Sequence, residues 1–224
     1  MRKWGIVISA FYAAIVLGLL VPAGVFLSEG RALPAETFLR DLQSLYGTWI
    51  SWVPIAVLIS GQALLLFLSV DASFKKLKPR THIAVSVTVG SMLFALLVFA
   101  GLSAAGAAVE GDAFFDHFWI SEIQVIAIWA AIWLIWGVAF YLYARGSFER
   151  ASRVVSWLLK GSVLELLIAV PCHVWVRRRD DCSAPVATSF GIVAGIAVML
   201  MCFGPSVLFL VKKRLDGYSV RKSA

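Results

Sequence analysis

Long apolar runs alternate with short polar segments along the whole chain. An α-helix needs about 20 mostly apolar residues to cross roughly 30 Å of hydrocarbon at 1.5 Å per residue. Six runs meet this length, at residues 4–27, 49–70, 81–107, 119–144, 154–176 and 186–211. The pattern predicts an all-α, polytopic membrane protein, in which six transmembrane helices form a bundle. We expect residues 1–224 to make a single integral membrane domain with no soluble domain.

The segment between the first two runs has a different pattern. Apolar side chains recur there on one helical face, at Phe38, Leu39, Leu42, Leu45 and Tyr46. Pro34 suits the first turn of a helix, and Gly47 suits its C-terminal end. We therefore predict a short amphipathic helix that lies on the membrane surface between spans 1 and 2.

Composition supports the membrane assignment and excludes other classes. Apolar residues make up 61% of the 224 residues and charged residues 15%, against roughly 45–50% and about 25% in soluble domains. A soluble fold of this size cannot hide so much apolar surface. A soluble enzyme, a disordered chain and a disulfide-rich secreted module are thus excluded. The sequence also lacks nucleotide-binding, hydrolase and zinc-protease motifs, which argues against an enzyme without deciding the point.

The distribution of positive charge predicts the orientation. The net charge is +7, but the basic residues cluster between the apolar runs, as topology signals do, so we expect lipid rather than nucleic acid as the partner. If both termini face the cytoplasm, that side holds 14 Lys and Arg residues and the opposite side holds 5. This asymmetry predicts a bacterial-type cytoplasmic membrane, with cytoplasmic termini and an extracytoplasmic loop at residues 177–182.

A carboxyl group interrupts the fifth apolar run. Glu165 lies eleven residues into that run, about 16 Å from its start and near the bilayer midplane. An ionised side chain at this depth costs at least about 2.5–3.5 kcal/mol, so Glu165 should face the bundle. The same counting places Gln62 and Ser91 at a matching depth. These residues are candidates for a substrate or ion site, and the alternative is a structural hydrogen-bond network.

Three arginines stand where topology does not require them. Arg177, Arg178 and Arg179, here named the arginine triplet, fall on the expected outer side. Guanidinium groups at headgroup level can bind an anionic lipid or a small anionic substrate. Alternatively, Asp180 and Asp181 neutralise them in a salt-bridged turn.

The cysteines and histidines near this turn suggest another kind of chemistry. Cys172 and Cys182 both lie on the expected outer side and are candidates for a disulfide or a redox dithiol, unless they are inert. His173 and His117 share that side and could hold a metal or haem, although no ligand spacing supports this and no cofactor is evident. Otherwise they form interfacial hydrogen bonds.

Two helical spacings in the runs indicate close contacts. Trp129, Trp133 and Trp136 form one stripe in the fourth run, which suits packing against a helix or lipid or contact with a bound ring system. Gly191 and Gly195 in the sixth run have the spacing of small residues at close helix contacts.

Three function classes remain compatible with these patterns. We favour a small permease-like or substrate-binding membrane component, because a midplane carboxylate near proline-kinked helices is typical of a translocation path. The alternative is a membrane thiol-redox or metal- or haem-handling protein that uses Cys172, His173 and Cys182. A further alternative is a structural or assembly subunit that binds membrane partner subunits.

Overall fold

A computed structural model gives the architecture of the chain. It describes the backbone of residues 2–29, 34–71, 79–114, 122–144, 150–179 and 181–222. Side chains are described for residues 5–29, 34–66, 85–114, 123–142, 154–179 and 181–203.

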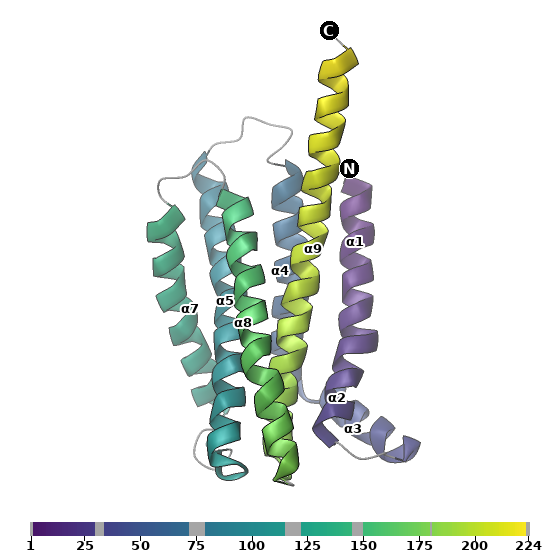
Figure 1. Ribbon diagram of the computed structural model, residues 1–224, viewed down its shortest axis with the longest axis vertical. Helices are drawn as coiled ribbons and strands as arrows, with labels where there is room; N and C mark the ends of the chain where they lie inside the picture. Colours follow the sequence, from purple (N-terminus) through teal and green to yellow (C-terminus); the bar gives the residue numbers. More distant parts are fainter. Residues whose placement is uncertain are drawn as a thin grey trace.

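The elements in these ranges are all helical (Figure 1). In chain order they are α1 (Arg2–Ile15), the π-helical turn η1 (Val16–Leu20), α2 (Val21–Glu29), α3 (Ala35–Gly47), the 3₁₀ turn η2 (Trp49–Ser51), α4 (Trp52–Asp71), α5 (Pro79–Glu110), α7 (Glu122–Ala144), α8 (Arg150–Arg178) and α9 (Ala184–Lys222). The first span joins α1, η1 and α2 into one continuous rod.

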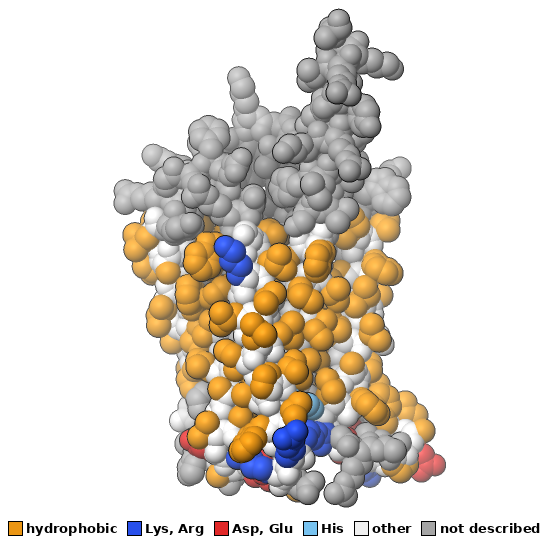
Figure 2. All heavy atoms as spheres, viewed as in Figure 1, with side chains coloured by type: hydrophobic (Ala, Val, Ile, Leu, Met, Phe, Trp, Pro, Cys, Tyr) orange, Lys and Arg blue, Asp and Glu red, His pale blue; other side chains and the backbone are white. Residues whose placement is uncertain are grey.

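Six helical segments are long and apolar enough to cross a membrane. They are Gly5–Glu29, Trp49–Leu66, Val85–Glu110, Ile123–Leu142, Val154–Arg178 and Ala184–Phe203. These segments confirm the six predicted spans. Figure 2 shows apolar side chains covering the middle of the bundle, and most of the charged side chains that the structure describes on this face lie at the end that carries α3. The chain is therefore a multi-pass helical membrane protein.

The third and sixth spans form the centre of the bundle. Helix α5 packs against α7, α8 and α9, and α9 also contacts α2, α4 and α8. Helix α7 and the first span lie on opposite sides (Figure 1). The main apolar core includes Leu93 and Leu97 of α5, Leu158 of α8, and Val198 and Met201 of α9. These helices run nearly parallel to the long axis, so the bundle has two ends (Figure 1). We call the end that carries α3 the α3 end, and the opposite end, where α1 begins and α9 ends, the terminal end.

Helix α3 is fastened to the first span at the π-helical turn. In that turn the Val21 N–H donates to the Val16 carbonyl, one residue further back than in an α-helix. The Tyr46 hydroxyl donates a hydrogen bond to the neighbouring Leu17 carbonyl. Leu42 and Leu45 of α3 pack with Tyr46 against the main core. These contacts confirm the predicted short amphipathic helix, although Leu39 of its predicted apolar face is 61% exposed.

Candidate functional site

Glu165 occupies the middle of α8 and turns into the bundle. Its side chain is only 3% exposed. Both carboxyl oxygens are buried, and neither has a hydrogen-bond partner among the described residues. Buried polar groups are nearly always hydrogen-bonded, so an unpaired carboxyl group in a membrane span is exceptional.

Glycines of α5 and α9 make room for this carboxyl group. A Cβ atom placed on Gly191 would lie 2.9 Å from Oε1 of Glu165, and one on Gly195 would clash with Oε2. Across α5, a Cβ on Gly101 would lie 3.5 Å from Cγ of Glu165. The spacing of Gly191 and Gly195 thus lets α9 approach α8 until its backbone covers the carboxyl group.

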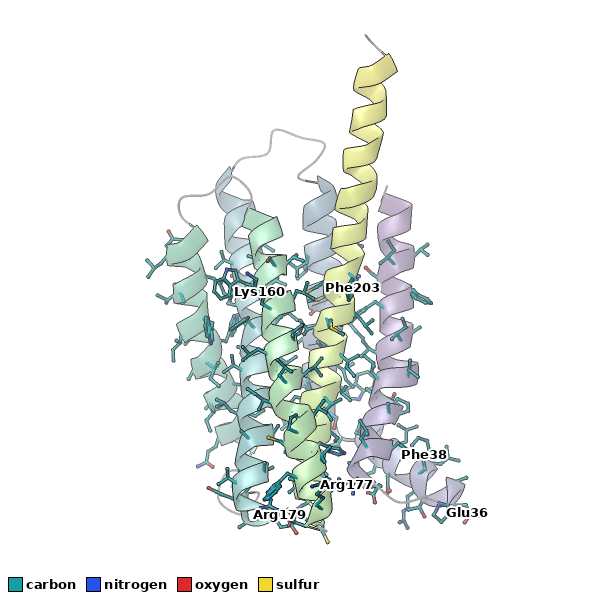
Figure 3. All side chains as sticks on the ribbon, in the orientation of Figure 1. Glu36, Phe38, Lys160, Arg177, Arg179 and Phe203 are labelled. Atoms are coloured by element: carbon teal, nitrogen blue, oxygen red, sulfur yellow. The ribbon has the colours of Figure 1, made fainter. Side chains whose placement is uncertain are left out.

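This packing favours the protonated form of Glu165. Transferring an isolated ionised carboxylate into an apolar environment is strongly unfavourable without a paired charge. Lys160, one and a half turns earlier on α8, points to Trp157 instead, with Nζ 6.0 Å from the ring centroid. Figure 3 shows Lys160 towards the terminal end of the bundle. Ionisation of Glu165 therefore requires water, a cation or a movement of the helices around it.

The structure does not bring Ser91 to Glu165. Its hydroxyl donates to the Thr88 carbonyl, at 3.0 Å, and its Oγ is 3.7 Å from the Cβ position of Gly137 on α7. Ser91 precedes Gly101, the glycine beside Glu165, by ten residues, or about 15 Å of helical rise. The expected match in depth fails because α5 starts further towards the terminal end, so that Gly90, rather than residue 81, contacts Val154.

Gln62 is displaced in the same direction. It is 2% exposed in α4, and its Oε1 atom has no hydrogen-bond partner among the described residues. The adjacent Gly61 contacts Leu93 of α5, which lies eight residues, or about 12 Å of helical rise, from Gly101. Glu165 is therefore a single buried carboxyl group rather than one member of the expected polar triad.

The arginine triplet lies at the α3 end, and two of its members bind the protein itself. Arg177 donates a hydrogen bond to the Leu27 carbonyl of α2. Arg179 pairs with Asp181, at 3.0 Å, and also donates to the Ala107 carbonyl of α5, at 3.3 Å. Figure 3 shows both side chains at this end. Arg178 is exposed. The salt-bridged turn is thus present, through Asp181, and Asp180 lies outside the described residues. Within the described part of the chain, Arg178 is the member of the triplet without a protein partner.

The cysteines do not form the disulfide considered above. Cys172 and Cys182 both keep free thiols. Helix α8 continues through Pro171 to Arg178, which holds Cys172 half-buried on the helix, whereas Cys182 is exposed in the turn before α9. Regular helix between the two positions therefore keeps the sulfurs apart.

His173 forms a hydrogen bond between two helices, in agreement with the second of the two roles expected for it. Its Nδ1 lies 2.8 Å from Oγ1 of Thr188, which joins α8 to the first turns of α9. His117 lies outside the described residues. Within the described ranges, no group of three His, Cys, Asp or Glu side chains is placed to hold a metal ion.

A second carboxyl group, which sequence patterns did not single out, organises the α3 end. Asp112 accepts hydrogen bonds from the backbone N–H groups of Cys182, Ser183 and Ala184, at 3.0, 2.8 and 3.1 Å, and from the Ser183 hydroxyl, at 2.9 Å. These donors, led by the backbone N–H groups, hold the pKa of Asp112 well below its usual range. Asp112 thereby caps the N-terminus of α9 from another part of the chain.

The turn that carries Asp112 depends on a glycine. Gly111 follows the last residue of α5 with φ +67°, and its N–H closes the helix on the Ala107 carbonyl, at 2.9 Å. This left-handed conformation favours glycine at a helix end. A Gly-Asp pair after a long apolar run indicates such a turn, but nothing nearby in the sequence identifies the helix that Asp112 caps.

No protein-family model, curated protein or solved structure matches the chain. The functional assignment therefore depends on the site geometry alone.

Proposed function

We propose that the protein is a small permease-like membrane component in which Glu165 binds and releases a proton or cation during transport. The observation that supports this proposal is the burial of both Glu165 carboxyl oxygens, without a hydrogen-bond partner among the described residues, in the middle of a span. A purely structural carboxyl group would be expected to hydrogen-bond to a neighbouring helix.

The surroundings of Glu165 couple its charge to helix packing. While Glu165 is neutral, α9 packs on it through Gly191 and Gly195. Ionisation in the same place would cost at least about 2.5–3.5 kcal/mol, so loss of the proton favours an arrangement in which water or a cation reaches the carboxylate. Two packing states linked to one proton are the minimum that a coupled transporter requires.

The arginine triplet suggests at which side of the membrane a substrate would bind. With the termini in the cytoplasm, as the charge asymmetry predicts, the α3 end faces outwards. Arg178 is then an exposed cation on the outer surface that can attract a small anionic substrate or an anionic lipid. The free thiols of Cys172 and Cys182 give the thiol-redox and metal-handling alternative no supporting contact among the described residues.

The proposal is tested first by chemical modification. Dicyclohexylcarbodiimide enters membranes and adds to protonated carboxyl groups, so we expect a mass adduct on Glu165 whose yield falls as the pH rises. Glu165→Gln should give no adduct, and Glu36→Gln, which changes an exposed carboxylate on α3, should leave the adduct unchanged. A wild-type protein that stays unmodified across the pH range would contradict a titrating site.

Transport itself is tested in vesicles that contain a pH-sensitive dye. Small anions and cations are added outside in turn, and proton movement across the membrane is recorded. We expect Glu165→Gln to insert and purify normally but to abolish the proton movement that a substrate produces with the wild type. Unchanged proton movement in this variant would remove Glu165 from the mechanism.

A further inference from the structure

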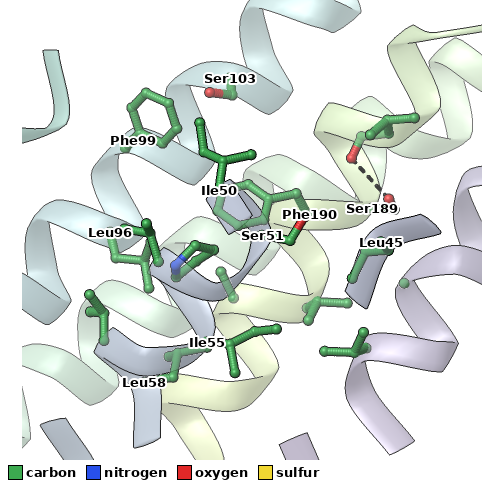
Figure 4. Close-up of a pocket in the computed structure, with 18 of the residues that line it drawn as sticks. Leu45, Ile50, Ser51, Ile55, Leu58, Leu96, Phe99, Ser103, Ser189 and Phe190 are labelled. Atoms are coloured by element: carbon green, nitrogen blue, oxygen red, sulfur yellow. Dashed lines mark hydrogen bonds between the residues drawn. The ribbon is translucent and has the colours of Figure 1, made fainter. Parts of the chain in front are cut away.

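An apolar cavity of about 360 Å³ lies between the helices near the α3 end. Figure 4 shows side chains from several spans around it. The lining includes Val16 of the π-helical turn, Leu45 of α3, Ile55 of α4, Phe99 of α5 and Phe190 of α9. Its volume falls within the roughly 300–1,000 Å³ that is typical of small-molecule sites, which are mostly apolar with a few polar groups. Glu165 does not line this cavity, so the cavity is a separate feature.

Two polar groups in the lining have no hydrogen-bond partner within the parts of the chain that the structure describes. The Ser103 hydroxyl, on a residue that is 1% exposed, and the Trp129 indole N–H are both buried and unpaired within the described part of the chain. Two other lining serines are satisfied locally, since Ser28 donates to the Val25 carbonyl at 2.8 Å and Ser189 to the Val186 carbonyl at 2.9 Å. Ser103 and Trp129 therefore differ from these two serines.

Ser103 and Trp129 lie on packed neighbours, α5 and α7. The contact between Ser91 on α5 and the Cβ position of Gly137 on α7 gives the offset of these two helices. Towards the α3 end, Ser103 lies twelve residues from Ser91 and Trp129 lies eight residues from Gly137, or about 18 and 12 Å of helical rise. Along the bundle the two groups are therefore about one helical turn apart.

The rest of the tryptophan stripe is satisfied without a ligand. Trp133 donates its indole N–H to the Thr88 carbonyl of α5, at 3.3 Å, and Trp136 packs on Phe94, with ring centroids 4.4 Å apart. Trp129 stacks on Trp133, with ring centroids 6.0 Å apart, but its own N–H has no partner within the described part of the chain. Helix packing thus accounts for Trp133 and Trp136, whereas in the described ranges the indole N–H of Trp129 remains free to bind a ligand.

We propose that this cavity binds a fatty acyl chain from the bilayer, with its carbonyl oxygen accepting hydrogen bonds from Trp129 and Ser103. The apolar lining suits the chain, and the two unpaired donors suit one acceptor oxygen. The π-helical turn at Val16 widens the first span where it borders the cavity, and such turns occur frequently at functional sites. A fatty acid and a phospholipid both supply this chemistry.

Photochemical labelling tests the occupant directly. Purified protein in detergent is incubated with palmitic acid that carries a diazirine in its chain, and in parallel with phosphatidylcholine that carries the same diazirine chain. After illumination, cross-linked peptides are mapped by mass spectrometry. We expect labels on cavity residues such as Phe99 and Phe190, above the labelling of the lipid-facing Leu134 and Ile135. The arm that labels the cavity identifies the source of the chain, and cavity labelling in neither arm overturns the proposal.

A matched pair of double variants tests the two polar groups. Ser103→Ala with Trp129→Phe should lower cavity labelling about 10-fold relative to lipid-facing labelling, since it removes two hydrogen-bond donors. Ser189→Ala with Trp133→Phe removes the same atoms from groups that already have partners, and it should leave the labelling ratio unchanged. Equal labelling in the first variant and the wild type, or equal loss in both variants, would contradict the assigned contacts.

A second pair of variants decides the matter if the double variant does not fold. Ile55→Trp should fill part of the cavity and abolish cavity labelling, whereas Leu64→Trp adds the same bulk on the exposed face of α4 and should not. Retained labelling in Ile55→Trp would show that the chain binds elsewhere. Because Glu165 is not among the residues that line the cavity, failure here leaves the proton-linked function untouched.

Discussion

Helix α9 contacts two carboxyl groups, of which it hydrogen-bonds one and, in the part of the chain that the structure describes, leaves the other without a hydrogen bond. Asp112 lies at its N-terminus and accepts four hydrogen bonds there. Glu165 lies two to three turns further along, where Gly191 and Gly195 present close backbone but no hydrogen bond to the carboxyl oxygens among the described residues. The first N–H groups of a helix lack internal partners, whereas those in its middle are already used. The same helix therefore stabilises a negative charge at its start and disfavours one along its length.

The largest expected effect comes from closing the space around Glu165. Gly195→Val puts side-chain atoms where the Glu165 carboxyl group and Leu166 now lie, and overpacking typically costs about 1–3 kcal/mol. We expect the thermal unfolding midpoint in detergent to fall by about 3–10 °C. Gly18→Ala is the control, since a Cβ there meets no atom within 4 Å, and it should be neutral or mildly stabilising. Equal midpoints for both variants would contradict the close α8–α9 contact.

Removing the carboxyl group of Asp112 should have the next largest effect on stability. Asp112→Ala leaves three N–H groups at the start of α9 without their acceptor, and loss of a helix cap costs about 0.5–2 kcal/mol. The same unfolding assay should show a lower midpoint. Asp41→Ala is the comparison, because Asp41 makes only a 3.9 Å pair with an exposed arginine, and such pairs contribute about 0–1 kcal/mol. If the Asp41 variant loses as much stability, the cap is not the cause.

The pH dependence of stability should separate the two carboxyl groups further. The pKa of Asp112 is lowered by its hydrogen bonds, so its contribution is fully present above the unfolded pKa of about 3.9. It is then lost progressively as the pH falls through that value towards the lower folded pKa, with a slope of at most about 1.4 kcal/mol per pH unit. Unfolding midpoints measured between pH 6 and pH 3 should fall more steeply for the wild type than for Asp112→Asn. Parallel curves would show that the charge of Asp112 does not contribute.

The smallest effect is expected at Glu165 itself. Glu165→Leu removes a buried polar group that has no hydrogen-bond partner among the described residues, and such replacements are often neutral or stabilising. The unfolding midpoint should therefore stay within about 3 °C of the wild type or rise. A loss as large as that of Asp112→Ala would mean that Glu165 hydrogen-bonds to another group in the folded protein. That result would favour a structural role.

The sequence predicted the features that depend on local patterns. The six spans and the amphipathic α3 followed from hydropathy and helical spacing, because lipid imposes length and polarity on each segment separately. The inward orientation of Glu165 followed from the cost of exposing it to lipid. Its glycine surroundings were visible as spacing in the sixth run, although the partner of that spacing was not.

Features that depend on the relative placement of helices could not be predicted in this way. The sequence placed Ser91 at the depth of Glu165, which is wrong. The start of an apolar run does not fix how far its helix is offset from its neighbours, and Gly90 of α5 lies beside Val154 of α8. The cap by Asp112 joins positions about 70 residues apart, and no local pattern reports such a contact. The cavity has no sequence signal, since it depends on how five spans fit together.

The contacts of α9 also have a consequence for biogenesis. This helix is the last of the six spans to leave the ribosome, and until it inserts, Gly191 and Gly195 cannot cover Glu165. A five-span intermediate would therefore expose a carboxyl group to hydrocarbon, while the uncapped Asp112 would simply face water. Insertion of α9 covers the Glu165 carboxyl group and, in the same step, supplies the N–H groups that hydrogen-bond to Asp112. A chain that lacks α9 thus keeps an uncovered carboxyl group within the apolar part of the bundle.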